Sequence, residues 1–214
     1  MRKSCRVAVL ISGRGSNLKS LIENAANYEI SLVLSNNPEA PGKTYAEAHK
    51  IGFEAFRRDN YKSVGELKAA IRSRLIQENP RFVCLAGFML IVDQETIEQF
   101  PNRILNIHPS LLPNFPGLDT HERAVAGSVQ RHGCTVHLVD RGVDTGLIVA
   151  QAGLDVRTGE SAAELGARVL ALEHQLYPWV VNNLAAGNIE LSDGNVKFSS
   201  VAKEEAERRG FLLP

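Results

Sequence analysis

An asparagine and a histidine, Asn106 and His108, stand two residues apart at the end of an apolar run that begins at Ile104. Side chains with this spacing lie on the same face of an extended strand, so both can point into one site. The Pro-Ser-Leu-Leu-Pro segment at 109–113 then turns the backbone off a sheet, because proline cannot donate to a strand ladder and restricts its predecessor. An amide and an imidazole at such a strand end suit a reaction that develops negative charge on oxygen and moves a proton.

A second candidate is the loop Ser12-Gly13-Arg14-Gly15-Ser16-Asn17, which follows an apolar run and precedes a helical pattern. Main-chain N–H groups at a helix start favour an anion, and glycines let a phosphate approach closely. The loop matches neither common nucleotide fingerprint, since Leu18 stands where a dinucleotide loop has its third glycine and no Gly-Lys-Ser/Thr is present. A phosphate site and an ordinary tight turn, with Ser16 or Asn17 as helix cap, therefore both stay open.

Other chemistry has less support in the sequence. The remaining histidines lack the spacing of metal ligands, so we expect no metal site and interpret these residues mostly as surface or strand-face histidines: His49, His121, His132, His137 and His174. Ser110 lies between proline and leucine without a glycine elbow, which predicts a structural role. Asn106 and His108 also have a non-catalytic interpretation, as a cap and a surface imidazole that shape a loop in a nucleotide-binding module.

Apolar runs and helical patterns alternate through the first half of the chain. Strands are predicted at residues 7–11, 30–34, 54–56 and 82–86, and helices from Leu18, at 43–51 and from a capping box at Ser63 and Glu66. Three strand–helix units followed by a fourth strand predict an α/β fold with a doubly wound, mostly parallel sheet. Ligands gather at the carboxyl ends of such strands, so we expect residues 13–15, 87–89 and 106–108 along one rim.

The second half continues with mixed elements. The patterns predict a helix at 121–126, a strand at 135–139, a polar loop at 140–146, a return strand at 147–151, and a helix from a capping box at Ser161 and Glu164 to about Ala186. The tail from Asn188 offers short strand candidates without a legible role. No linker or repeat demands a boundary, so we predict a single domain over residues 1–214.

Composition narrows the class of protein. Lysine plus arginine and aspartate plus glutamate number 24 each, so no overall basic field would attract nucleic acid or anionic lipid. Cys5, Cys84 and Cys134 lie far apart, which favours reduced thiols and a cytoplasmic location. The basic start leads into an apolar stretch too short for a signal peptide or a membrane span. We therefore expect a soluble protein without nucleic-acid or membrane partners.

Four segments, at 13–17, 85–89, 105–113 and 140–146, together resemble the phosphoribosylglycinamide formyltransferases, the folate-dependent enzymes of purine synthesis. The likeness extends from the first strand to the helix that carries Leu172-Glu173-His174. Its Asn-x-His-Pro-Ser-Leu-Leu-Pro segment with a later aspartate is shared with other formyltransferases that use 10-formyltetrahydrofolate, including methionyl-tRNA formyltransferase. The Gly-x-Gly-Ser-Asn loop and the short length are typical of the glycinamide ribonucleotide branch.

The resemblance implies transfer of the formyl group of 10-formyltetrahydrofolate to the amine of glycinamide ribonucleotide, with Asn106, His108 and Asp144 as the catalytic trio. The residues implied to hold the ribonucleotide are Gly13, Gly15, Ser16, Asn17, Pro109 and Glu173. The residues implied to bind the folate, largely through backbone groups, are Met89, Leu90, Ile91, Val92, Asn106, Asp140, Arg141, Gly142, Val143 and Asp144. These small molecules would be the only ligands of a metal-free monomer or homodimer.

Three positions depart from the family pattern. Leu90 stands where some members carry arginine, and the stretch 62–64 lacks an arginine used elsewhere near the folate tail. Asp119 replaces a histidine that is common in its loop. The first two departures argue against side-chain contacts to the folate glutamate at these positions, and leave backbone contacts to the pterin unaffected.

The residues suit this chemistry. An amine attacks the formyl carbon, Asn106 donates to the developing oxyanion, and a cationic His108 supplies a proton to the departing nitrogen. Asp144 would orient the imidazole and raise its pKa, so we expect the acidic form of His108 to persist above the ordinary value of about 6.5. A formyltetrahydrofolate hydrolase would use the same trio with water as acceptor, and would not need the phosphate loop.

Overall fold

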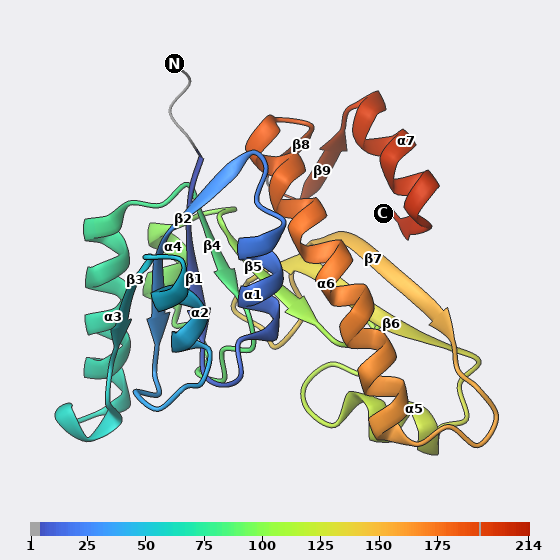
Figure 1. Ribbon diagram of the computed structural model, residues 1–214, viewed down its shortest axis with the longest axis horizontal. Helices are drawn as coiled ribbons and strands as arrows, with labels where there is room; N and C mark the ends of the chain where they lie inside the picture. The colour runs from blue at the N-terminus through green and yellow to red at the C-terminus, as the bar shows by residue number, and fades with distance from the viewer. Residues whose placement is uncertain (1–4, 193) are drawn as a thin grey trace. The chain divides into compact units, whose positions relative to one another are not determined.

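The computed structural model describes residues 5–192 and 194–214 and divides into two compact units (Figure 1). One unit ends at Leu105 and the other begins at Asn106, so the division falls within the strand β5 (Ile104–His108). Each unit combines strands with covering helices. The single domain expected from the sequence stays a prediction.

Parallel strands form the centre of the first unit. They lie in the order β4-β1-β2-β3, and the pairs β1–β2, β1–β4 and β2–β3 are all parallel. Their bounds are β1 (Cys5–Ile11), β2 (Tyr28–Ser35), β3 (Gly52–Ala55) and β4 (Phe82–Leu85). The chain winds outward from β1 to β3 and returns to the other side of β1. This places a topological switch point, the usual ligand position of such sheets, at the carboxyl ends of β1 and β4.

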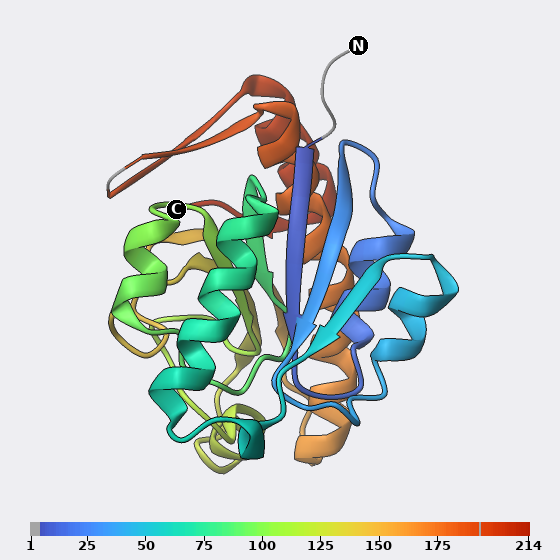
Figure 2. The ribbon, with the colours of Figure 1, turned by 90° about the vertical axis from the view of Figure 1, so that its left-hand side faces the viewer.

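Helices cover both faces of this parallel sheet. They are α1 (Ser16–Glu23), α2 (Lys43–Ala48), the 3₁₀ helix η1 (Arg58–Asn60), α3 (Val64–Glu78) and α4 (Gln94–Gln99). Figure 2 shows α1 and α2 on one face and α3 on the other. The predicted α/β class with a doubly wound, mostly parallel sheet is thereby confirmed.

Two local predictions in this unit were wrong in detail. The helix predicted at 43–51 ends at Ala48, because Lys50 adopts a left-handed backbone with φ of 56°. Ser63 caps α3 by accepting from Glu66 N–H at 3.1 Å, but the Glu66 carboxylate accepts from Lys62 N–H rather than from Ser63 N–H. The capping box at this helix is therefore incomplete.

Antiparallel strands and one long helix dominate the second unit, whose strand order is β10-β7-β6-β5. The antiparallel partners are β6 (Arg131–Leu138), β7 (Ile148–Asp155) and the edge strand β10 (Phe211–Leu212). The helix α6 (Ala162–Ala186) packs on β6 and β7, and α5 (Thr120–Ala126) packs on α6 (Figure 1). The predicted capping box of Ser161 and Glu164 at the start of α6 is confirmed.

The tail completes the second unit. It consists of the hairpin β8 (Ile189–Ser192) and β9 (Asn195–Phe198), then α7 (Ser200–Arg209) and β10. Trp179 on α6 donates its Nε1–H to the Glu205 carboxylate at 3.0 Å and packs its ring edge against Phe211, with 5.3 Å between centroids. The tail thus covers one edge of β7 and is anchored to α6. No helix in the described part of the chain is long and apolar enough to cross a membrane.

Candidate active site

The second unit brings together the three residues predicted to be catalytic. His108 Nδ1 lies 3.2 Å from Asp144 Oδ2, and Asn106 Nδ2 lies 3.5 Å from Asp144 Oδ1. Asn106 and His108 both lie on β5, and their spacing of two residues directs both side chains to the same carboxylate, as the sequence predicted. His108 is buried and Asp144 is half-buried, so the cluster is largely shielded from water.

His137, at the end of β6, is a fourth member of this cluster that sequence reasoning missed. Its side chain is only 2% exposed. His137 Nδ1 donates to the Leu138 carbonyl at 2.8 Å, so in the neutral ring Nε2 carries the lone pair and accepts from Asn106 Nδ2 at 3.1 Å. Nε2 also lies 3.5 Å from Asp144 Oδ1. His137 therefore orients the amide of Asn106.

Backbone groups of the segment after β5 hold both members of the histidine–aspartate pair. His108 Nε2 donates to the Phe115 carbonyl at 2.9 Å, and Gly117 N–H donates to Asp144 Oδ2 at 2.8 Å. Both nitrogens of His108 thus face acceptors. Only the doubly protonated ring satisfies both of them, because a neutral ring turns its one lone pair toward either the carboxylate or the carbonyl, depending on the tautomer.

Burial opposes the cationic form of His108. Removal from water lowers the pKa of His108, while the hydrogen bond to Phe115 and the charge of Asp144 raise it, and burial outweighs them. The pKa therefore lies below its ordinary value of 6.5. The expectation that the acidic form persists above that value was wrong in its net direction, although Asp144 does act in the expected sense.

Asp144 is held in its charged form. Burial alone would raise the pKa of this carboxyl, but the neighbouring His137 ring, the hydrogen bond from Gly117 N–H and the charge of His108 together outweigh burial and lower it. The residue adopts φ of 55°, a left-handed conformation that is rare outside glycine. Its carboxylate thus remains an anion beside the imidazole at neutral pH.

The polar loop at 140–146 contains the predicted folate residues 140–144. Asp140 Oδ1 accepts from Gly142 N–H at 3.0 Å and from Thr145 Oγ1 at 2.8 Å, which ties the loop into a compact turn. Arg141, Gly142 and Val143 lie exposed at its surface. The loop therefore offers backbone groups and the apolar Val143 side chain to solvent.

Two predicted ribonucleotide residues also belong to this unit. Pro109 is half-buried directly after β5, and Glu173 is buried on α6. Burial raises the pKa of Cys134 on β6, and the charge of Glu173 adds to this effect. Cys134 is consequently an inert thiol.

In the first unit, the glycine loop begins at the switch point between β1 and β4. Ser12 N–H donates to the Gly87 carbonyl at 3.1 Å, and Ser12 Oγ accepts from Met89 N–H at 2.8 Å. The segments 13–15 and 87–89 therefore share one rim, as predicted. Asn106–His108 belongs to the other unit.

The two glycines of this loop have different roles. Gly15 is the N-cap of α1 with φ of 72°, and a Cβ on it would lie 2.7 Å from Gly42 Cα. The alternative cap by Ser16 or Asn17 was wrong, since no side chain caps this helix. A Cβ on Gly13 would meet nothing within 4 Å. Gly15 is thus required by the fold, whereas Gly13 borders open space.

The predicted folate residues 89–92 follow β4. Met89 and Ile91 are 68% and 67% exposed, which is unusual for large apolar side chains. Leu90, Ile91 and Val92 line a narrow crevice of about 20 Å³ together with Phe88 and residues of α3. The segment thus carries apolar side chains that are available to a ligand.

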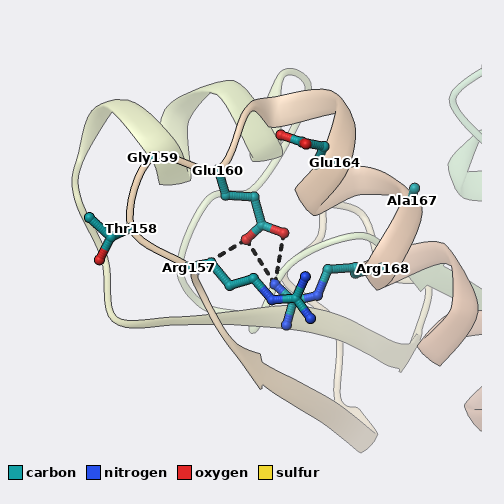
Figure 3. Close-up of a pocket in the computed structure, with 7 residues that line it drawn as sticks. All are labelled: Arg157, Thr158, Gly159, Glu160, Glu164, Ala167 and Arg168. Carbon is teal, nitrogen blue, oxygen red and sulfur yellow. Dashed lines mark hydrogen bonds and ion pairs between the residues drawn. The ribbon is translucent and has the colours of Figure 1, made fainter.

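A separate hollow of about 420 Å³ opens beside the start of α6 (Figure 3). It is lined by Arg157, Thr158, Gly159, Glu160, Glu164, Ala167 and Arg168. Arg168 Nη1 donates to both carboxylate oxygens of Glu160 at 2.8 Å, and the Arg157 N–H donates to the same carboxylate at 3.0 Å. The hollow contains none of the predicted site residues, and its ion pair fixes the turn before α6.

Two further histidines pack beside the segment that follows β5. His121 Nδ1 lies 3.2 Å from His132 Nε2, and the His132 ring meets the Phe115 ring edge-on at 5.8 Å. His132 is buried on β6, which agrees with the strand-face alternative and not with the surface alternative expected from the sequence. Burial, then the charges of His121 and His108, lower the pKa of His132 to about 4. Among the described residues, no group of three or more side chains could hold a metal ion.

This pKa predicts acid sensitivity. The unfolded chain binds a proton on His132 near its ordinary pKa of 6.5, whereas the folded protein binds that proton only near pH 4. The stability of the folded protein therefore falls as the pH drops through this window. We expect the melting temperature to fall less between neutral pH and about pH 5 in His132→Gln than in the unchanged protein. The exposed His49→Gln serves as control. Equal pH dependence in all three proteins would contradict the prediction.

Known proteins with similar sequences and structures indicate the family of this chain. Residues 5–181 match a family described as formyl transferase. The phosphoribosylglycinamide formyltransferase of Haemophilus influenzae is 37% identical, over 88% of this chain and 91% of that protein. The structure of glycinamide ribonucleotide transformylase 1 from Symbiobacterium toebii has a TM-score of 0.87 at 37% identity, covering 92% of this chain and 95% of that one.

A further relative is much longer. The human trifunctional purine biosynthetic protein adenosine-3 is 38% identical over 95% of this chain, which spans only 20% of that protein. The structure defines an α/β protein in which an amide, an imidazole and a carboxylate meet, groups whose chemistry suits proton transfer beside an oxyanion. The chain belongs to the formyl transferase family.

Proposed function

We propose that this protein transfers the formyl group of 10-formyltetrahydrofolate to the amine of glycinamide ribonucleotide, a step of purine synthesis. The observation that carries the proposal is the cluster in which Asn106 and His108 both meet the carboxylate of Asp144. The names of the bacterial relatives, which match over most of both chains, support the choice of substrates.

Each residue of the cluster has a role in this reaction. Asn106, oriented by His137, has an amide that can donate to the formyl oxygen as it becomes negative. His108 gives a proton through Nε2 to the departing nitrogen of the folate, and the proton lost by the attacking amine restores the cationic ring. In this step the substrate atom takes the place of the Phe115 carbonyl. Asp144 stabilises the cationic ring from the Nδ1 side.

Binding of the substrates is assigned to exposed loops and segments. We assign the ribonucleotide phosphate to the loop of Gly13, Gly15, Ser16 and Asn17, because helix N–H groups attract an anion. 10-Formyltetrahydrofolate supplies an activated formyl group on a largely planar, partly apolar scaffold. The exposed side chains of Met89 and Ile91 are suited to such a scaffold.

A direct assay separates the candidate functions. The purified protein is given 10-formyltetrahydrofolate with and without glycinamide ribonucleotide, and both formylated ribonucleotide and free formate are measured. We expect folate deformylation that requires the ribonucleotide and yields formylated product. Formate release without the ribonucleotide would indicate a hydrolase. Binding of the ribonucleotide without turnover would indicate a non-catalytic module.

Gly13→Val tests the phosphate assignment. The added side chain enters open space next to the loop, so the fold is kept while an approaching phosphate is obstructed. We expect the Kd for glycinamide ribonucleotide, measured by calorimetry, to rise about tenfold or more, with folate affinity unchanged. Gly52→Val provides the control, since its Cβ would have only ordinary contact with Leu32. Unchanged ribonucleotide affinity in Gly13→Val would contradict the phosphate assignment and leave the loop with the role of a turn only.

We further propose that the chain acts as one domain, as a monomer or homodimer in the cytoplasm. The three cysteines, all free thiols, support a reducing compartment. Light scattering after gel filtration measures the state of assembly, and a tetramer or larger particle would contradict the proposal. Two separate thermal transitions would contradict a single cooperative domain.

A further inference from the structure

The side chain of Arg123, on α5, contacts the segment 115–119 at three points. Its Nη1 donates to the Pro116 carbonyl at 2.6 Å and to the Leu118 carbonyl at 3.2 Å. The guanidinium also lies over the Phe115 ring, 5.4 Å from its centroid. A planar guanidinium suits two carbonyls and a ring face at once, whereas an ammonium group does not.

The same segment binds both catalytic side chains. The Phe115 carbonyl accepts from His108 Nε2, and Gly117 N–H donates to Asp144 Oδ2. A shift of 115–119 would therefore disturb the tautomer and orientation of His108 together with the direction of the Asp144 carboxylate. Arg123 makes no described hydrogen bond or ion pair with either side chain. Its charge lowers the pKa of His108 directly, after the larger effect of burial, and its contacts reach both side chains through the segment.

The backbone of the segment needs support from outside. Phe115, Gly117 and Asp119 all have positive φ, of 54°, 78° and 55°. Non-glycine residues adopt this region rarely and at a cost, and they remain there where surrounding contacts hold them. Arg123 supplies contacts on the solvent side, and the ring of His132 supports Phe115 edge-on.

We propose that Arg123 is a positioning residue for formyl transfer: by holding the segment 115–119, it sets the orientation of His108 and Asp144 before the substrates bind. The kinetic part of this inference rests on the proposed function. The structural part does not, because the hydrogen bond of His108 to Phe115 exists without substrate.

The experiment compares Arg123→Gln with the unchanged protein by kinetics and by NMR of the histidine rings. We expect kcat to fall about tenfold or more, with KM for both substrates within about twofold, because misplaced catalytic groups cost rate more than binding. The Nε2–H signal of His108 should exchange faster with water in the variant. Arg131→Gln is the matched control, since this exposed arginine has a long ion pair of 3.7 Å with Asp155.

A rescue experiment separates positioning from general damage. Free guanidinium at millimolar concentration should restore part of the kcat of Arg123→Ala, while ammonium should not, because only guanidinium matches the two carbonyls and the ring. Equal effects of the two cations would contradict the inference. The melting temperature of each variant shows that the fold is kept.

The outcomes for the two proposals can be told apart. If the unchanged protein transfers no formyl group, the proposed function fails, and the His108 signal still tests the role of Arg123. If the unchanged protein is active while Arg123→Gln keeps both its kcat and its His108 signal, the inference is wrong. A rise in kcat would also overturn it, because the segment would then obstruct His108.

Discussion

Replacing Asp144 with asparagine is expected to lower kcat by about 10²-fold or more while KM for both substrates changes little. The carboxylate meets His108 Nδ1 at 3.2 Å and stabilises the cationic ring, which matters most when the proton moves. An asparagine keeps the size of the side chain and can still accept from Gly117 N–H. The fold and the substrate contacts should therefore survive, and the loss should appear in turnover.

Asp144→Asn should also change the pKa of His108 in a definite direction. Burial already lowers the pKa of His108, and the charge of Asp144 partly offsets that effect. Removing the charge should lower the pKa further. As the pH rises, Asp144→Asn should therefore lose the activity that needs the cationic ring at a lower pH than the unchanged protein does. NMR titration of His108 measures this in both proteins, with the exposed Asp155→Asn as control. The same His108 pKa in Asp144→Asn would remove Asp144 from its assigned role.

The sequence could predict the features that depend on local patterns. The apolar runs predicted the parallel strands of the first unit, and the two-residue spacing of Asn106 and His108 predicted that both side chains point to one place. The capping box at Ser161 was correct because cap and carboxylate are three residues apart. Each of these features is decided by neighbours along the chain.

Features that depend on residues distant in sequence could not be predicted. His137 stands 31 residues after Asn106, and its contact follows from how the strands are placed in the second unit. Its signal in the sequence was weak: a polar residue near the end of an alternating strand, just before the polar loop. The role of 115–119 depends on left-handed backbone at Phe115 and Asp119, which no glycine marks.

The direction of the His108 pKa shift could not be predicted from the sequence for the same reason. The sequence suggested an opposite charge nearby and thus a raised pKa. It could not show how deeply the ring is buried, and burial has the larger effect. The capping box predicted at Ser63 is incomplete because the Glu66 carboxylate accepts from Lys62 N–H instead of Ser63 N–H.

Asn106→Ala is expected to cost about 10² to 10³ in kcat, the usual effect of removing one donor to an oxyanion. The amide of Asn106 is held by His137 Nε2 at 3.1 Å, so it is oriented before any substrate arrives. Such a fixed donor stabilises charge that develops during the reaction and contributes little to binding the ground state. KM should therefore change far less than kcat.

The variant also removes the donor to His137, so a modest loss of stability, about 1–2 kcal/mol, is expected beside the kinetic effect. Asn114→Ala is the matched control, because this asparagine lies exposed nearby and its backbone groups make its contacts with Ser110 and Leu111. The decisive measurement is kcat well below the melting temperature of the variant, where the loss of stability leaves the protein folded. If kcat there stayed within tenfold of the unchanged protein, Asn106 would be a support for His137 and the oxyanion donor would have to be another group.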